Sequence, residues 1–321
     1  MNEYKPEGSL IKTEKNYRLI SSKSGLETAL EKQIILEAPV VLCDHNFDLH
    51  VEFPSGLLGI IPRNEVEYSA DGEIAKDIAI LTRVGKTVAF KVIGFKTCSD
   101  GESVAILSRR AAQRECIENL INNLVPGDII PAKVTHLESF GAFVDIGCGR
   151  ISLLSIDSIS VSRISHPSAR LSVGDMIYTV VKGIDERGRI FLSGRELLGT
   201  WEENAATFSA GQTVAGIIRS VEPYGIFVEL TPNLAGLAEL RDDGSSLFGK
   251  DCCGRVAAVY IKSIIPERMK IKLVMVDSYK GEATPTRLRY FVDTERTLHI
   301  DRWRYSPLSC GRVVETVFTE S

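Results

Sequence analysis

The sequence predicts a mainly β protein of three small closed barrels in tandem, joined by short helices and followed by a C-terminal β extension. Three observations support this fold class. A unit of about 70 residues recurs three times. Within each unit, apolar and polar residues alternate over about five short runs bounded by glycine-containing turns, which is typical of strands in a small barrel. Between the units, apolar residues recur at helical spacing instead.

The repeat is clearest where the stretch FGAFVDI at 140–146 returns as YGIFVEL at 224–230. The similarity extends upstream and downstream of both stretches and delimits barrels at 126–195 and 209–277. A weaker copy precedes them at 36–110, where NFDLHVEF leads into GLLGIIPRNEV. Each copy is long enough to bury a core of its own.

Two segments, 111–125 and 196–208, join the barrels and are expected to be helical linkers. Apolar residues at helical spacing are Ile117, Leu120, Ile121 and Leu124 in the first, and Leu197, Trp201, Ala205 and Phe208 in the second. Residues 1–35 are polar and are expected to form a partly disordered N-terminal extension with an amphipathic stretch at 26–35.

A glycine between two aromatic residues marks the repeated stretch. In an unbroken strand, Phe140 and Phe143 would face opposite sides, because side chains alternate. We interpret Gly141 as a β-bulge that changes this parity. Ala142, Val144 and Ile146 would then point inward and both rings outward, and Tyr224 and Phe227 would do the same in the third unit. The alternative is that these rings belong to the core, as strand phenylalanines usually do.

Composition excludes several classes of protein. No apolar run is long enough to cross a membrane, and the polar N-terminus does not resemble a secretion signal. Seven cysteines without C-x-x-C spacing indicate reduced thiols, so we expect a cytoplasmic protein. Neighbouring Cys252 and Cys253 are expected to be small core residues rather than a redox pair or a metal site.

Catalysis finds no support in the sequence. Phosphate-binding, nucleophile-elbow, metalloprotease and dinucleotide-binding motifs are all absent from it. We therefore expect a chain that is not an enzyme and uses no cofactor, metal or small-molecule substrate. The net charge of −4 also argues against coating nucleic acid by bulk attraction, so a polyanion would need a local binding face.

These motifs resemble the S1 RNA-binding domain family, whose fold is a five-stranded OB-fold barrel. The supporting segments are PGDIIPAKVTHLESFGAFVDIG, ISHPSARLSVGDMIYTVVKGID and GRIFLS in the second unit. Their tandem order is similar to that of bacterial ribosomal S1 proteins and shorter relatives. The resemblance implies that single-stranded RNA is the ligand, held by two aromatics, a histidine and a charged pair.

The resemblance assigns site residues unit by unit. In the second unit they are Phe140, Phe143, Asp185 and Arg189, with Ser155 at the family's histidine position and His166 in a loop motif that either contacts the RNA backbone or caps a turn. In the third unit they are Tyr224, Phe227 and Lys270, with Ala238 at the histidine position.

The first unit departs from this pattern. Phe47 and His50 occupy the aromatic positions, and Asp48 replaces the glycine and adds negative charge beside the expected phosphate path. By analogy with the N-terminal repeats of ribosomal S1 proteins, we expect this unit to contact the small ribosomal subunit instead of RNA. Asp44, His45 and His50 have no recognised metal-ligand spacing.

The tail at 278–321 alternates arginine with apolar residues. Our preferred interpretation is a β-strap that closes over the third barrel. In the alternative, Arg287, Arg289, Arg302 and Arg304 extend the RNA path and Trp303 or Tyr305 stacks on a base.

The resulting functional hypothesis is an RNA-binding protein that holds single-stranded mRNA by aromatic stacking and presents it to the ribosome. Two alternatives remain: a protein-interaction scaffold or regulator with the same fold, and an accessory subunit of an RNA-degrading complex.

Overall fold

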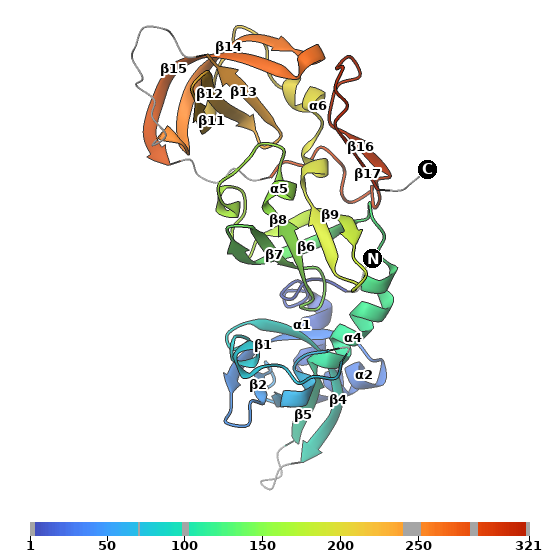
Figure 1. Cartoon of the computed structure of the whole chain (residues 1–321). Coiled ribbons are helices and arrows are strands. Elements are labelled where there is room, and N and C mark those ends of the chain that lie inside the picture. Colours follow the sequence, from blue (N-terminus) through green and yellow to red (C-terminus); the bar gives the residue numbers. More distant parts are fainter. Residues whose placement is uncertain (1–3, 70, 98–102, 240–251, 283–287, 319–321) are drawn as a thin grey trace. The chain divides into compact units, whose positions relative to one another are not determined.

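The computed structural model describes residues 4–69, 71–97, 103–239, 252–282 and 288–318 (Figure 1). It divides into two compact units. The first comprises residues 1–124, 131–133 and 145–151, and the second comprises 125–130, 134–144 and 152–321. The middle part of the chain therefore contributes residues to both units.

Three closed five-stranded barrels confirm the predicted fold class. The strands of the first are β1 Leu36–Cys43, β2 Leu49–Glu52, β3 Leu58–Ile61, β4 Thr87–Thr97 and β5 Ser103–Ser108. Those of the second are β6 Ile129–Glu138, β7 Gly141–Asp145, β8 Ile151–Ser155, β9 Met176–Ile184 and β10 Ile190–Ser193. Those of the third are β11 Thr213–Glu222, β12 Gly225–Thr231, β13 Leu234–Ala238, β14 Arg255–Ile265 and β15 Lys270–Glu282.

All three barrels share one topology. Around each, the strands follow the order first, second, third, fifth, fourth. The third and fifth strands pair in parallel, whereas the fourth and fifth strands pair antiparallel in every barrel. A common order over three segments of one chain is what a tandem repeat of a single barrel should produce.

Period-two alternation places the cores as the sequence predicts. On β7, Ala142 and Val144 are fully buried, as are Ile226 and Val228 on β12. Along each strand, these inward-pointing residues alternate with residues whose side chains point out of the barrel.

The glycine of the repeated motif does not form the bulge we predicted. Gly141 is the first residue of β7, directly after a turn at 139–140, and Gly225 begins β12 in the same way. A Cβ on Gly141 would lie 2.5 Å from the Leu154 carbonyl oxygen, and one on Gly225 would lie 2.7 Å from that of Ala238. The position is therefore glycine because the third strand of the barrel passes too close for a side chain.

Short helices flank and connect the barrels. The α-helices are α1 Glu14–Ile20, α2 Lys23–Glu31, α3 Asp77–Leu81, α4 Arg109–Asn119, α5 Ile156–Ile159 and α6 Trp201–Ala205. Single 3-10 turns are η1 Arg63–Glu65, η2 Ile121–Asn123, η3 Pro167–Ala169, η4 Arg195–Leu198 and η6 Pro266–Arg268. Helix α6 starts with a complete capping box, in which the Thr200 hydroxyl accepts from the Glu203 N–H and the Glu203 carboxylate accepts from the Thr200 N–H.

The N-terminal extension is more ordered than its polarity suggests, because buried carboxylates hold it within the first unit. Glu7 pairs with fully buried Arg109 (Nε to Oε1, 2.7 Å), and its N–H donates to Asp145 Oδ2 at 2.7 Å. Glu37 Oε2 accepts from the N–H groups of Leu10 and Ile11 at 2.8 and 2.9 Å. Burial raises the pKa of Glu37 to about 7 and that of Asp145 to about 6.

The C-terminal extension forms a two-stranded sheet of β16 Arg302–Arg304 and β17 Glu315–Val317. Trp303 and Tyr305 are buried in the core cluster of the third barrel, so neither ring is available to stack on a base. Tyr290 and Ile300 pack on Ile129 of the second barrel. The strap interpretation therefore describes the geometry, with contacts to both barrels. Arg287 lies outside the described residues.

Among the residues that the structure describes, no helix is long and apolar enough to span a membrane. Within the same ranges, no group of three or more potential metal ligands is found. The six described cysteines are free thiols, and Cys98 lies outside the described ranges. Cys252 is buried as expected, whereas Cys253 is exposed.

Candidate nucleic-acid interface

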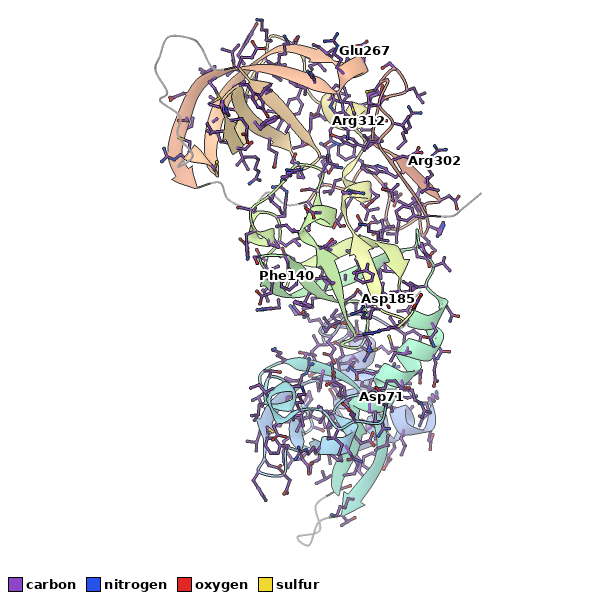
Figure 2. The ribbon with its side chains drawn as sticks, viewed as in Figure 1. Asp71, Phe140, Asp185, Glu267, Arg302 and Arg312 are labelled. Atoms are coloured by element: carbon purple, nitrogen blue, oxygen red, sulfur yellow. The ribbon has the colours of Figure 1, made fainter. Side chains whose placement is uncertain are left out.

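Phe140 and Phe143 lie close together on the surface of the second barrel and are called here the second ring pair. Phe140 sits in the β6–β7 turn and is 53% exposed, and half-buried Phe143 follows on β7 (Figure 2). Their ring centroids are 5.9 Å apart and the planes are nearly perpendicular at 88°. Phe140 leaves the core because it lies in the turn, and Phe143 points outward because it alternates with buried Ala142 and Val144.

Tyr224 and Phe227 repeat this arrangement on the third barrel and are called the third ring pair. Tyr224 is 63% exposed, and the centroids lie 6.2 Å apart at an interplanar angle of 89°. Two independent copies of one edge-to-face geometry indicate that the repeat preserves a surface, because either ring pair alone could be an accident of packing.

Neighbouring strands extend each ring pair with residues that the sequence reasoning missed. The His136 ring stacks on Phe143 at a centroid distance of 6.3 Å and an angle of 23°. On β10, Phe191 is 38% exposed and pairs with Leu153. Each of these residues is isolated in sequence, and only the pairing of strands reveals them.

In the third barrel, the residues that neighbour the ring pair on adjacent strands include a cation. Leu237 on β13 pairs with Phe227 on one side and with Lys272 on β15 on the other. Directly paired residues share one face of a sheet, so Lys272 lies on the face of the third ring pair. Its ammonium is 3.6 Å from a Glu239 carboxylate oxygen. Lys270, predicted from the sequence, is exposed two residues earlier on the same strand.

The predicted charged residues of the second barrel pair with each other. Arg189 Nε donates to Asp185 Oδ2 at 2.7 Å in the β9–β10 turn. The pKa of Asp185 lies below its ordinary value, first because the Arg189 backbone N–H donates to its carboxylate. Figure 2 shows Asp185 apart from Phe140 on this barrel. The structure therefore does not bring this pair together with the second ring pair.

His166 caps a turn, one of the two roles considered for it. Its Nδ1 accepts from the Ser168 N–H at 3.2 Å at the start of η3. Its contact with RNA remains a prediction.

Among its described residues, the first barrel has no exposed ring pair. Phe47 sits under the Arg63 guanidinium, whose carbon is 4.9 Å from the ring centroid. His50 Nε2 lies 3.0 Å from Asp44 Oδ2. Asp48 Oδ1 accepts from the Arg63 N–H at 2.8 Å. The aromatic positions of this unit are thus already occupied by contacts within the chain.

Comparison with known proteins matches part of this chain to a family. Residues 124–195 match the family model described as "S1 RNA binding domain". The resemblance to the S1 RNA-binding domain family is confirmed. This S1 domain coincides with the second barrel, which carries Phe140 and Phe143.

Two curated relatives extend the similarity beyond the S1 domain. The chain is 31% identical to small ribosomal subunit protein bS1 of Staphylococcus saprophyticus over 52% of this chain and 45% of the relative. It is 29% identical to bS1 of Mycobacterium tuberculosis over 74% of this chain and 48% of the relative. The chain thus spans about half the length of these relatives.

Among solved structures, GSP13 from Bacillus subtilis is 32% identical over 23% of this chain and 57% of that chain, with a TM-score of 0.22. A TM-score this low supports no structural argument.

Proposed function

We propose that this chain binds single-stranded RNA on the ring pairs of its second and third barrels and holds mRNA for the ribosome. The observation that carries the proposal is the recurrence of one exposed edge-to-face ring pair at the same place on two barrels. Stacking on aromatic rings suits unpaired bases, because side chains cannot reach the bases in the deep groove of an RNA duplex. The match to the S1 RNA-binding domain and the similarity to bS1 support this ligand class.

Exposed cations of the second and third barrels would contact the phosphates. Arg189 and Lys270 are exposed on their barrels, and Lys272 shares the face of the third ring pair. Because few cations are involved, affinity should fall with rising salt but only modestly. His166 and Asp185 would orient the strand on the second barrel.

The test is RNA affinity measured by fluorescence anisotropy with an unstructured oligonucleotide. Each stacked base contributes about 1 to 3 kcal/mol, so the Phe140→Ala/Phe143→Ala variant should bind at least about tenfold more weakly. Tyr17→Ala is a matched control, because Tyr17 is an exposed ring on α1, outside both ring pairs. Equal affinity of wild type and the double variant would remove the stacking role.

The first barrel supports a second contact, with the small ribosomal subunit. Its aromatic positions are occupied, and residues 36–110 carry eleven acidic against eight basic residues. A variant lacking all four rings of the ring pairs should lose RNA affinity yet still co-sediment with small subunits. Loss of both activities together would favour a chain that reaches the ribosome only through RNA.

A further inference from the structure

A pocket of about 660 Å³ adjoins the third ring pair. One wall is Tyr224 and Phe227 of the third barrel, together with residues of β11. The facing wall is the loop 161–165, which belongs to the second barrel. All of these residues lie in the second unit of the chain. The volume is within the range of about 300 to 1,000 Å³ typical of ligand sites.

Backbone hydrogen bonds fix the loop wall against the third barrel. The Ser162 N–H donates to the Pro232 carbonyl at 3.0 Å. The Val161 N–H donates to Asn233 Oδ1, also at 3.0 Å, and fully buried Asn233 donates through Nδ2 to the Arg195 and Gly199 carbonyls. Because buried Asn233 is itself held by hydrogen bonds to Arg195 and Gly199, this wall exists before any ligand arrives.

Charge at the pocket favours an anion. Glu229 is shared by two guanidinium groups: Arg170 Nη2 donates to Oε2, and Arg219 Nε donates to the same oxygen at 2.7 Å. One carboxylate against two arginines leaves a net positive charge, and Arg219 lines the pocket. Arg163 on the loop wall is exposed and has no ion pair among the described residues. Glu222, which also lines the pocket, is acidic and offsets part of this positive charge.

One buried polar group in the pocket lining has no partner in the part of the chain that the structure describes. Ser162 is 8% exposed, and its hydroxyl oxygen makes no hydrogen bond to any described residue. An unpaired buried hydroxyl costs free energy that a ligand donor or acceptor would recover. Apolar Val161, Ile164 and Ile218 complete the lining. Rings, an apolar wall, a free hydroxyl and net positive charge together match a flat base, a ribose and a phosphate.

We propose that this pocket holds one unpaired nucleotide of the bound RNA strand, clamped between the third ring pair and loop 161–165 of the preceding barrel. The inference rests on the proposed RNA binding at Tyr224 and Phe227 and adds a second wall to it. The third barrel alone would then be an incomplete site.

Cys253 provides the test, because it is exposed and lines the same pocket. Alkylation of the intact chain by iodoacetamide, read per peptide by mass spectrometry, reports access to Cys253, and half-buried Cys43 in the first barrel is the internal control. At an unstructured RNA concentration ten times Kd, mass action leaves about one-eleventh of the sites free, so Cys253 should react about elevenfold more slowly and Cys43 at its original rate.

Two charge-reversal variants test whether the loop wall is needed for the protection of Cys253. Arg163→Glu should abolish the protection of Cys253 at that RNA concentration, whereas Arg187→Glu, a matched change in the β9–β10 turn, should retain it. Equal protection in both variants would overturn the role of the loop wall.

The remaining outcomes separate the inference from the proposed function. RNA that binds by anisotropy but leaves Cys253 reactivity unchanged overturns the pocket and leaves RNA binding intact. RNA that does not bind at all overturns both. Protection by free AMP or UMP without protection by RNA would assign the pocket to a free nucleotide and overturn the RNA assignment.

Discussion

Burial of the ion cluster of Arg170, Glu229 and Arg219 predicts how variants of these residues differ in stability. The side chains of Arg170 and Glu229 are 1% and 4% exposed, and that of Arg219 is 13% exposed. Glu229→Gln would leave two buried guanidinium groups facing each other without a counter-charge. Removing one partner of a buried ion pair costs about 3 to 5 kcal/mol, so this variant should be destabilised by that amount.

Arg170→Met is the matched comparison. It removes one of two like charges and leaves Glu229 with both of its hydrogen bonds to Arg219, at 2.7 and 3.2 Å. Because Glu229 keeps Arg219 as its counter-charge, no buried charge is left unpaired, so the cost should stay below about 2 kcal/mol.

Tryptophan fluorescence during urea unfolding measures this directly. The chain has two tryptophans, and both Trp201 and Trp303 belong to the core cluster of the third barrel. The unfolding midpoint should fall much further for Glu229→Gln than for Arg170→Met. An unchanged midpoint in Glu229→Gln, or a larger loss in Arg170→Met, would refute the electrostatic argument.

Three further predictions concern other parts of the chain. Gly141→Ala should cost about 1 to 3 kcal/mol in unfolding free energy, because its Cβ would meet the Leu154 carbonyl. The control is Gly183→Ala on β9, which has open space around it and should change the unfolding free energy by no more than about 0.5 kcal/mol. The pKa of Glu37 is raised to about 7 in the folded state, so the native first barrel binds a proton that the unfolded chain releases. The stability of this barrel should therefore fall by at most roughly 3 kcal/mol as the pH rises from about 5 to about 8. Hydrogen exchange of first-barrel peptides should show this decline in wild type and a smaller one in Glu37→Gln. Phe47→Ala should leave RNA affinity in the anisotropy assay unchanged, because Arg63 already covers that ring; a tenfold loss would show that the first barrel binds RNA.

The barrels could be predicted from sequence because their signal is local and repeated. Alternation of apolar residues fixes which side chains enter a core, and buried Ala142, Val144, Ile226 and Val228 follow it. The reason for the glycine could not be found this way. The close approach of Leu154 to Gly141 joins residues 13 positions apart, and sequence alternation carries no information on how near the next strand passes.

Contacts between residues far apart in the sequence explain the other features that could not be predicted. Asp145 alternates with inward-pointing Val144 and Ile146, a pattern that predicts a solvent-facing side chain, yet it is 2% exposed because Glu7 and its neighbours cover it. A contact spanning 138 residues has no periodic signature. His136 and Lys272 were missed for a related reason, since each joins its ring pair only through strand pairing.

Stacking itself is tested most directly by comparing an unstructured RNA oligonucleotide with an abasic RNA of the same length, which keeps the phosphates and lacks the bases. The wild-type chain should bind the base-containing strand at least about tenfold more tightly, since each stacked base contributes about 1 to 3 kcal/mol. A variant with alanine at Phe140, Phe143, Tyr224 and Phe227 should no longer distinguish the two strands. Equal affinity of the wild-type chain for both would contradict RNA binding by the ring pairs.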